Sequence, residues 1–338
     1  MTTVSTLGQQ LGVIARMKEI QGQMNTYQEQ VTSGVKHQTF AGYGVESLKI
    51  QRYRSGMKEL EAYGYNIANA QMQIQQMDDA IEENTVQARN LLSAIGIQLS
   101  RGTEFDLATI KQTASTALQI IEANVNVEVG GRYLFSGSDV TNKPLNGTSG
   151  ADNNLALKVT DWLDGTNDTD AFLASFDALS DAESGFSNTV QTAKNVYVRA
   201  DDNYEVDYTV KANSPGMKKV LNGLRAISQM EFPDETTDVA SKEDFYKVID
   251  HLYSTIQDGV NALRADSAKL ANATAVLSNI QTNHENDIQS MQTLMEQTET
   301  ADPTDAIIKF QTLQTQLEAS YNVTSIMSQL SLARFLGG

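Results

Sequence analysis

Residue types that often carry catalysis or bind metals are sparse in this sequence. The 338-residue chain has no cysteine and three histidines, His37, His251 and His284. No two histidines have the spacing of a metal-binding pair, and His284 falls on an apolar helical repeat, where a helix-interface role is favoured over a ligand role. We therefore expect no metal site and no thiol chemistry.

Two further patterns resemble functional motifs but are better explained as turns. Gly42 and Gly44 form a Gly-x-Gly pair, but a helix precedes them where a dinucleotide site needs a strand. Asp201 and Asp202 could act as an acid and a base, yet they lie between two short alternating segments, as polar turn residues do. We predict no catalytic residue and no cofactor, and hence no enzyme; an enzyme carried on the middle segment is the alternative.

The charge of the chain bears on its partners. Forty-two acidic and 25 basic residues give a formal net charge of -17, which repels nucleic-acid phosphates and anionic membrane surfaces. Neither is an expected partner. The first twenty residues lack the basic leader and apolar core of a cleaved signal peptide, and no apolar run reaches the length of a membrane helix. Any export would follow another route.

Apolar residues recur every seven positions over two long stretches, which predicts coiled-coil helices. The first series comprises Tyr53, Leu60, Ile67, Ile74, Ile81, Ala88 and Ile95. The second comprises Ile249, Ile256, Leu263, Leu270, Leu277, His284 and Met291. A further helix is expected from about Phe105 to Val129, ending at the pair Gly130 and Gly131.

The middle of the chain, roughly 132–240, changes in character. It contains Asn-Gly and Asp-Gly pairs and short alternating runs, which favour turns and strands. We expect strands at LALKVT (155–160), NVYVRA (195–200) and YEVDYTV (204–210), and helices at DAFLASFDALSDA (170–182) and PGMKKVLNGLRAISQM (215–230). This segment is therefore predicted to be a small α+β domain.

Together these patterns predict a mostly α protein. Both chain termini form a long antiparallel or coiled-coil helical bundle, into which the small α+β domain is inserted. The expected parts are an N-terminal assembly helix and turn (1–44), a bundle core (45–131 with 241–302), the inserted domain (132–240) and a C-terminal assembly helix (303–338). Gly34, Gly42 and Gly44 on one side and Pro303 on the other are expected to act as joints.

The two outer helices carry apolar stripes with few hydrophobic residues nearby in the sequence to cover them. Such helices are marginal in water until they are packed, so we expect them to be largely disordered in the free chain and to become ordered on assembly. The predicted assembly interface consists of Leu7, Leu11, Ile14, Met17, Leu317, Tyr321, Met327 and Leu330.

Three segments resemble the flagellin-like family of bacterial axial proteins. QMNTYQEQVTSGVKHQTFAGYGVESLKI (23–50) is similar to the family's N-terminal helix and turn, with Ser33, Gly34 and Lys36 in matching places. Two other segments, VGGRYLFSGS (129–138) and LEASYNVTSIMSQLSLARFL (317–336), resemble the hook-filament junction members of the family. The first is matched at Gly131, Arg132, Tyr133, Phe135 and Gly137, and the second at Leu317, Ala319, Ser320, Tyr321, Ser328, Leu330, Ser331 and Leu332.

The resemblance implies a structural subunit of the extracellular flagellum that joins hook to filament. It implies export through the flagellar type III apparatus and, as partners, an export chaperone, neighbouring axial proteins and further copies of this chain. A filament flagellin of the same family is one alternative. A cytosolic coiled-coil adaptor or signalling module, which could show the same repeats, is an alternative from a different class.

Overall fold

A computed structural model describes the backbone of residues 2–101, 105–234 and 236–336. Side chains are described for Gly8 and from residue 11 to 329, apart from 101–104 and 235. The chain divides into two compact units, one made of residues 1–60 and 285–338 and the other of residues 61–284. The described residues are mostly helical, which confirms the predicted fold class.

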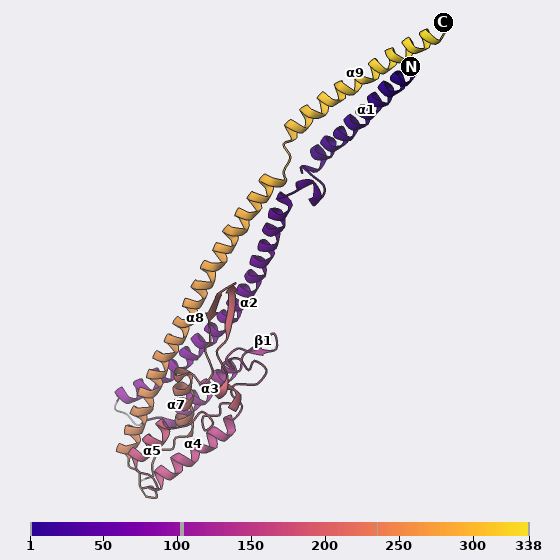
Figure 1. Cartoon of the computed structure of the whole chain (residues 1–338). Coiled ribbons are helices and arrows are strands. Elements are labelled where there is room, and N and C mark those ends of the chain that lie inside the picture. Colours follow the sequence, from indigo (N-terminus) through magenta and orange to yellow (C-terminus); the bar gives the residue numbers. More distant parts are fainter. Residues whose placement is uncertain (1, 102–104, 235, 337–338) are drawn as a thin grey trace. The chain divides into compact units, whose positions relative to one another are not determined.

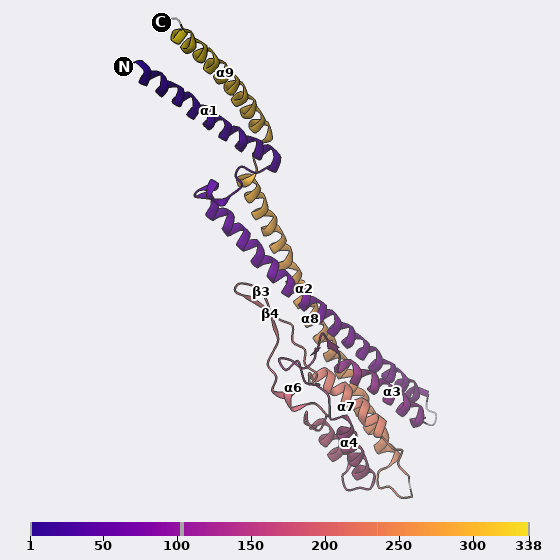
Figure 2. The same cartoon turned by 90° about the vertical axis from the view of Figure 1, so that its right-hand side faces the viewer.

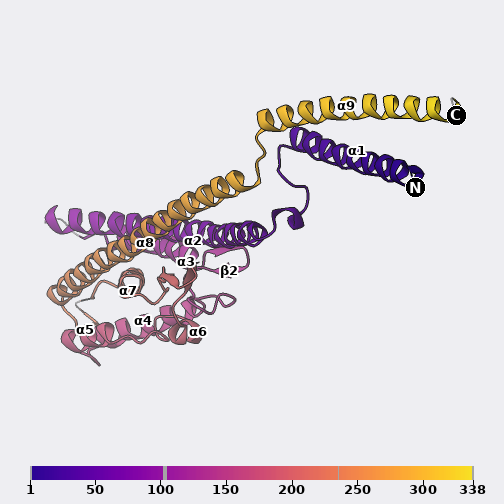
Figure 3. The ribbon, with the colours of Figure 1, turned by 45° about the horizontal axis from the view of Figure 1, so that its top comes forward.

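The first unit is built on two outer helices that lie side by side (Figures 1 and 3). Helix α1 (Thr2–Ser33) and helix α9 (Pro303–Leu336) run antiparallel, with both termini at the same end. Gln21 Nε2 donates to the Tyr321 hydroxyl at 3.0 Å, and Thr324 Oγ1 lies 3.9 Å from Met17 Sδ. The short 3-10 helix η1 (Phe40–Tyr43) lies in the turn that follows α1.

Two long helices, α2 (Glu46–Arg101) and α8 (Lys242–Glu299), contribute to both units. In the second unit they run antiparallel, because Gln71 hydrogen-bonds to Ser278 while Asp78, further along α2, accepts from Ser267, which comes earlier on α8. The sevenfold positions from Ile67 to Ile95 and from Ile249 to His284 are buried. The predicted seam is therefore the buried face of both helices.

The remaining elements belong to the second unit and include two small hairpins, of which Figure 2 shows the one formed by β3 and β4. They are α3 (Leu107–Val125), β1 (Glu128–Val129), β2 (Arg132–Tyr133), α4 (Thr148–Leu163), α5 (Thr169–Asp177), α6 (Asn188–Thr192), β3 (Tyr197–Asp201), β4 (Tyr204–Asp207) and α7 (Pro215–Gln229). Strands β1 and β2 pair antiparallel, as do β3 and β4. Strands were predicted near β3 and β4, and helices near α5 and α7; all four predictions are confirmed.

Two sequence predictions are wrong in this region. LALKVT (155–160) was expected to be a strand but lies inside α4. The buried residues Leu155, Val159 and Trp162 follow a helical spacing of four and three, and Leu157, which fits the strand alternation, is exposed. The helix expected to reach Val129 ends at Val125, and Gly130 and Gly131 form the β1-β2 turn, with φ of 60° and 80°.

One hydrophobic core joins the segment 132–240 to the long helices. The buried cluster runs from Ile74 on α2 and Ile121 on α3 through Trp162 and Leu224 to Leu252 on α8. Residues 132–240 therefore share their core with the bundle, and the compact unit extends from residue 61 to 284. The domain boundaries drawn from composition stay a prediction.

Helix α7 approaches α8 closely because glycines line the contact. A Cβ added to Gly216 would lie 2.7 Å from the Leu263 nitrogen, and one added to Gly259 would lie 2.8 Å from Val220 Cγ2. Side chains at these positions would push the helix backbones apart. The paired positions 216 on α7 and 259 on α8 thus set the spacing of the two helices.

The segment that carried part of the family resemblance has a structural role. Phe135 is fully buried, and its carbonyl accepts from the Ala212 amide at 2.8 Å. Gly137 has φ +66°, and a Cβ there would lie 2.9 Å from the Lys194 carbonyl oxygen. Phe135 therefore anchors this segment in the core, and Gly137 allows its backbone to approach residue 194 closely.

Candidate assembly surface

The eight predicted interface residues divide into two groups in the structure. Met17, Leu317 and Met327 are half-buried in the seam between α1 and α9. Leu11 and Ile14 remain 58% and 55% exposed. Tyr321 is also exposed at its ring, although its hydroxyl accepts from Gln21. The side chains of Leu7 and Leu330 lie outside the described residues.

The α1-α9 seam is narrow. It includes the half-buried residues Ile20, Met24, Tyr27, Phe310 and Leu313, and the described side chains of α1 include none that is fully buried. A pair of helices has only one mutual face, so each helix keeps an outer face in contact with water. The seam stabilises the pair without covering all of its apolar residues.

A second group of apolar side chains on these helices is exposed. It comprises Leu11, Ile14, Val31, Ile307, Ile308, Val323 and Ile326. The sequence did not single out three of them, Ile308, Val323 and Ile326, because they lie outside the main apolar stripe. Only their apolar type on a helix could have indicated them. Exposed apolar patches on ordered helices are typical of protein contacts.

The end of α8 is held to the end of α1 by backbone pairing. The Lys36 amide donates to the Glu299 carbonyl at 2.8 Å, and the Ala301 amide donates to the Gly34 carbonyl at 2.9 Å. Lys36 Nζ donates to the carbonyls of Gln297 and Thr298 at 3.2 and 3.0 Å. A cation at the carbonyl end of a helix stabilises it. Lys36 thereby caps α8.

Glycine and proline residues mark the ends of the helices at the predicted joints. Gly34 has φ +74° and Gly44 has φ +53°, a region that favours glycine. Pro303 is the first residue of α9, and the Asp302 carboxylate accepts from the amides of Thr304 and Asp305. Helix α9 therefore begins as a separate helix after α8, and the Asp302 side chain caps its first turn.

The two chain segments of the first unit carry net charges of opposite sign. Residues 1–60 hold seven basic and four acidic residues, a net charge of +3, and residues 285–338 hold two basic and seven acidic, a net charge of -5. The remaining charge of -15 belongs to residues 61–284. The first unit is thus nearly neutral overall, whereas the second is strongly acidic.

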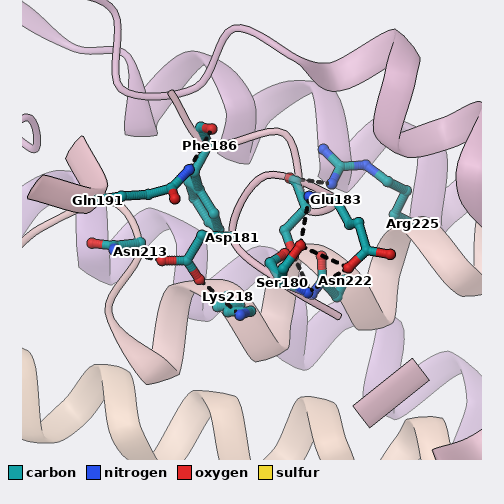
Figure 4. Close-up of polar contacts among 10 residues, drawn as sticks. Ser180, Asp181, Glu183, Phe186, Gln191, Asn213, Lys218, Asn222 and Arg225 are labelled. Carbon is teal, nitrogen blue, oxygen red and sulfur yellow. Dashed lines mark hydrogen bonds and ion pairs between the residues drawn. The ribbon is translucent and has the colours of Figure 1, made fainter. Parts of the chain in front are cut away.

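The second unit contains a buried charged network around Arg225 of α7. Arg225 is fully buried; its guanidinium lies 2.8 Å from Glu122 and 2.8 Å from Asp152, and donates to the Ser184 carbonyl at 2.9 Å. Figure 4 shows Arg225 and Asn222 facing the 180–187 loop, where Asn222 donates to Ser184. The network fastens α3, α4 and this loop to α7.

Beside this network lies a cleft of about 570 Å³. Its charged groups are paired: Lys218 with Asp181 at 2.7 Å, Lys219 with Asp258 at 3.2 Å, and His251 with Asp177 at 2.9 Å. Among the described residues no hydrogen bond joins the nearby Ser254 hydroxyl to His251, so the nucleophile-base contact of acyl transfer is not made. The pairs link α7 to the loop after α5, α7 to α8, and α8 to the end of α5.

Two carboxyl groups of these networks have shifted pKa values. Desolvation raises the pKa of Glu122 and outweighs the opposing effect of Arg225. Desolvation also opposes ionisation of Asp181, but hydrogen bonds from Lys218 and Asn213 prevail and lower its pKa. Both shifts follow from structural ion pairs, which perturb pKa values as active sites do.

The other histidine on α8, His284, is buried in the helix interface, as predicted. It lies beside the Tyr63 ring, and its Nε2 is 3.6 Å from Asp201 Oδ2. Within the described residues, no cluster of three histidine, aspartate or glutamate side chains is placed to hold a metal ion. The described helices also include none that is long and apolar enough to span a bilayer.

Comparison with known proteins gives matches at the level of structure. No protein-family model and no curated protein sequence matches the chain. A protein from Vibrio parahaemolyticus assigned as a flagellar hook-associated protein superposes with a TM-score of 0.56 at 14% identity, over 75% of this chain and 97% of that one. FlgL from Bacillus cereus superposes with a TM-score of 0.51 at 12% identity, over 73% and 98%.

The chain therefore has the fold of these flagellar hook-associated proteins. Both superpositions cover nearly the whole of the known structure, so the shared fold includes most of the architecture described above. The fold expected from the resemblance in the sequence is confirmed.

Proposed function

We propose that this protein is a structural subunit of the bacterial flagellum that joins hook to filament. The observation that carries the proposal is the pairing of α1 with α9 at the chain ends, which leaves apolar residues exposed on both helices. The fold shared with hook-associated proteins and the resemblance of segments 129–138 and 317–336 to junction members support it. In this proposal the protein acts by assembly and has no catalytic role.

The contacts that build the assembly involve the outer faces of α1 and α9. Leu11 and Ile14 on α1 and Val323 and Ile326 on α9 are exposed in the single chain, and neighbouring copies or axial proteins cover them. Burying apolar surface drives such association. The inner residues Met17, Leu317 and Met327 contribute to the seam between α1 and α9.

Ordering of the terminal helices accompanies assembly. A two-helix pair with a half-buried seam is marginal in water, so α1 and α9 open readily in the isolated chain and become fixed by their neighbours. This property suits secretion through the flagellar type III apparatus with an export chaperone as partner. Hydrogen exchange should show weak protection at Ile14 and strong protection at Ile74 in the monomer; strong protection at both would contradict coupled ordering.

Replacing Ile14 by Asp tests the assembly function. Ile14 is 55% exposed, so the substitution should leave the melting temperature of the free chain almost unchanged. It places a charge in the proposed interface, which costs several kcal/mol if the site is buried there. We expect loss of swimming motility and release of unassembled subunits into the medium when the variant replaces the normal protein.

Gln23→Asp is the matched control. It introduces the same change in charge on the same helix at an exposed position. Gln23 lies nine residues from Ile14, about two and a half turns, and so on the opposite side of the helix. Motility should be retained. If both variants swim normally, the outer face of α1 is not an assembly interface.

The filament flagellin of the same family remains the second candidate, because terminal helices of this kind serve both proteins. Copy number separates them: a junction subunit forms a short zone, whereas flagellin forms the bulk of sheared filaments. The cytosolic adaptor alternative requires the chain to stay inside the cell.

A further inference from the structure

The turn after α1 and the start of α2 present a surface of exposed apolar and basic side chains. We call it the basic turn surface; it consists of Phe40, Val45, Leu48, Arg54 and Lys58. The three apolar side chains are 51%, 94% and 55% exposed. Phe40, Arg54 and Lys58 also line a groove of about 460 Å³ with Ser47, Gln51 and Ser55.

This surface is held in place before any partner arrives. The Tyr43 hydroxyl donates to the His37 carbonyl at 3.1 Å, which fixes η1. The Arg54 guanidinium lies 5.2 Å from the centre of the Phe40 ring and pairs with Glu299 at 2.7 Å. An ordered aromatic ring with a cation over it is the kind of residue pair that anchors interfaces.

The charge around the groove selects an acidic partner. Residues 46–60 of α2 hold Lys49, Arg52, Arg54 and Lys58 against Glu46 and Glu59. Among the described contacts, Lys58 forms no ion pair. The surface thus offers cations next to apolar side chains.

A complementary surface lies further along the same helix. Residues 72–86 of α2 contain Asp78, Asp79, Glu82 and Glu83 and no basic residue. Met72, Asp79, Glu83 and Val86 are exposed and lie on one face, because their steps of seven, four and three match the helical repeat. We call these four residues the acidic stripe.

We infer that the basic turn surface of one copy binds the acidic stripe of a second copy of this chain. The inference rests on the proposed assembly function and specifies its partner. In this contact Lys58 of one copy lies against Glu83 of the second copy. The charged side chains pair across the contact, while Phe40, Val45 and Leu48 pack beside Met72 and Val86.

Such a contact joins two different surfaces, and it therefore propagates. Each added copy leaves one basic turn surface and one acidic stripe free for the next, as head-to-tail contacts do. The pairing also gives the contact a salt dependence, since exposed charges are screened over about 10 Å at 0.1 M ionic strength. It acts in addition to the contacts of α1 and α9.

Cross-linking of the full chain tests the contact directly. The natural chain has no cysteine, so Lys58→Cys and Glu83→Cys can be prepared separately, mixed and treated with a short bismaleimide. We expect heterodimers of these two variants at low salt and several-fold fewer at high salt. The control pairs Lys58→Cys with Asp250→Cys, another exposed acidic position on a helix; equal yields from the two mixtures would overturn the inference.

A charge exchange supplies the second test. By sedimentation velocity, Lys58→Glu and Glu83→Lys should each weaken self-association about tenfold at low salt, and mixing the two variants should restore it, because like charges oppose and opposite charges favour an encounter. No effect of either variant, or no self-association of the natural chain, would overturn the contact. If the protein is found at the hook-filament junction but these tests fail, the proposed function stands and only this contact is wrong.

Discussion

The buried Arg225 network gives a prediction of large magnitude. Replacing Arg225 by Met keeps much of the side-chain volume but removes the cation from a fully buried position. Glu122 and Asp152 then lose their common partner, and the Ser184 carbonyl loses a donor. Breaking a buried pair from one side costs about 3–5 kcal/mol. The two carboxylates are partly exposed, 22% and 36%, so we expect the lower value, about 3 kcal/mol.

Urea unfolding followed by tryptophan fluorescence measures this loss. Trp162 is the only tryptophan and is buried in the same unit, so its signal reports the relevant core. In thermal unfolding of a unit of this size, each kcal/mol of lost stability lowers the melting temperature by roughly 2–4 °C. We therefore expect the melting temperature of Arg225→Met to fall by roughly 6–12 °C. Lys219→Met is the control. Lys219 lies on α7 like Arg225, but its pair with Asp258 of α8 is exposed and should contribute less than about 1 kcal/mol.

The loss of unfolding free energy caused by Arg225→Met should also depend on pH. Desolvation raises the pKa of Glu122 in the folded chain, and Arg225 opposes that rise. Without Arg225, the pKa of Glu122 in the folded chain increases further. A carboxyl with a raised pKa contributes stability below its unfolded pKa, about 4.3, and that contribution is lost as pH rises through the folded value. The variant should therefore be closer to the natural chain at pH 4 than at pH 7. An equal effect of the Arg225 and Lys219 substitutions at pH 7 would refute the reasoning.

Three further predictions test the packing. Ile74→Asp, at a buried seam position, should lower the free energy of unfolding in a urea titration by several kcal/mol. Glu82→Asp, at an exposed position, should change it very little. Similar losses for the two variants would mean that the buried face is misassigned. Gly259→Ala forces a Cβ to within 2.8 Å of Val220 and should lower the free energy of unfolding by about 1–3 kcal/mol. Gly12→Ala has open space around it and should not destabilise the chain. Equal stability of the two variants by calorimetry would argue against close α7-α8 packing. Lys36→Met removes the cap of α8 and should cost about 1 kcal/mol, seen as faster hydrogen exchange at Ala301; unchanged exchange would show that Lys36 is not a cap.

The long helices were predictable because their buried residues recur at a fixed spacing. Ile67, Ile74 and Ile81 lie seven apart, and no other regular structure places such residues on one face. LALKVT (155–160) was mistaken for a strand because Leu155, Leu157 and Val159 alternate over only five residues. A short apolar run fits both periods, and packing in the core decides between them.

The assembly surface could be predicted only in part. The stripe on α1 follows from spacing, but spacing does not indicate which of its residues the partner helix covers, so Met17 and Ile14 appeared equivalent. Only the pairing with α9 separates them. The buried ion pairs of Arg225 could not be predicted either, because Glu122, Asp152 and Arg225 are distant in sequence and come together through tertiary packing.

The central claim is that this chain is a junction subunit of the flagellum, and its position in the organelle tests that claim most directly. Antibodies against the segment 132–240 can be visualised by immunogold electron microscopy on intact flagella of the source bacterium. The account predicts label confined to a short zone between hook and filament. Label along the whole filament would identify a flagellin instead, and label found only inside the cell would contradict the flagellar assignment.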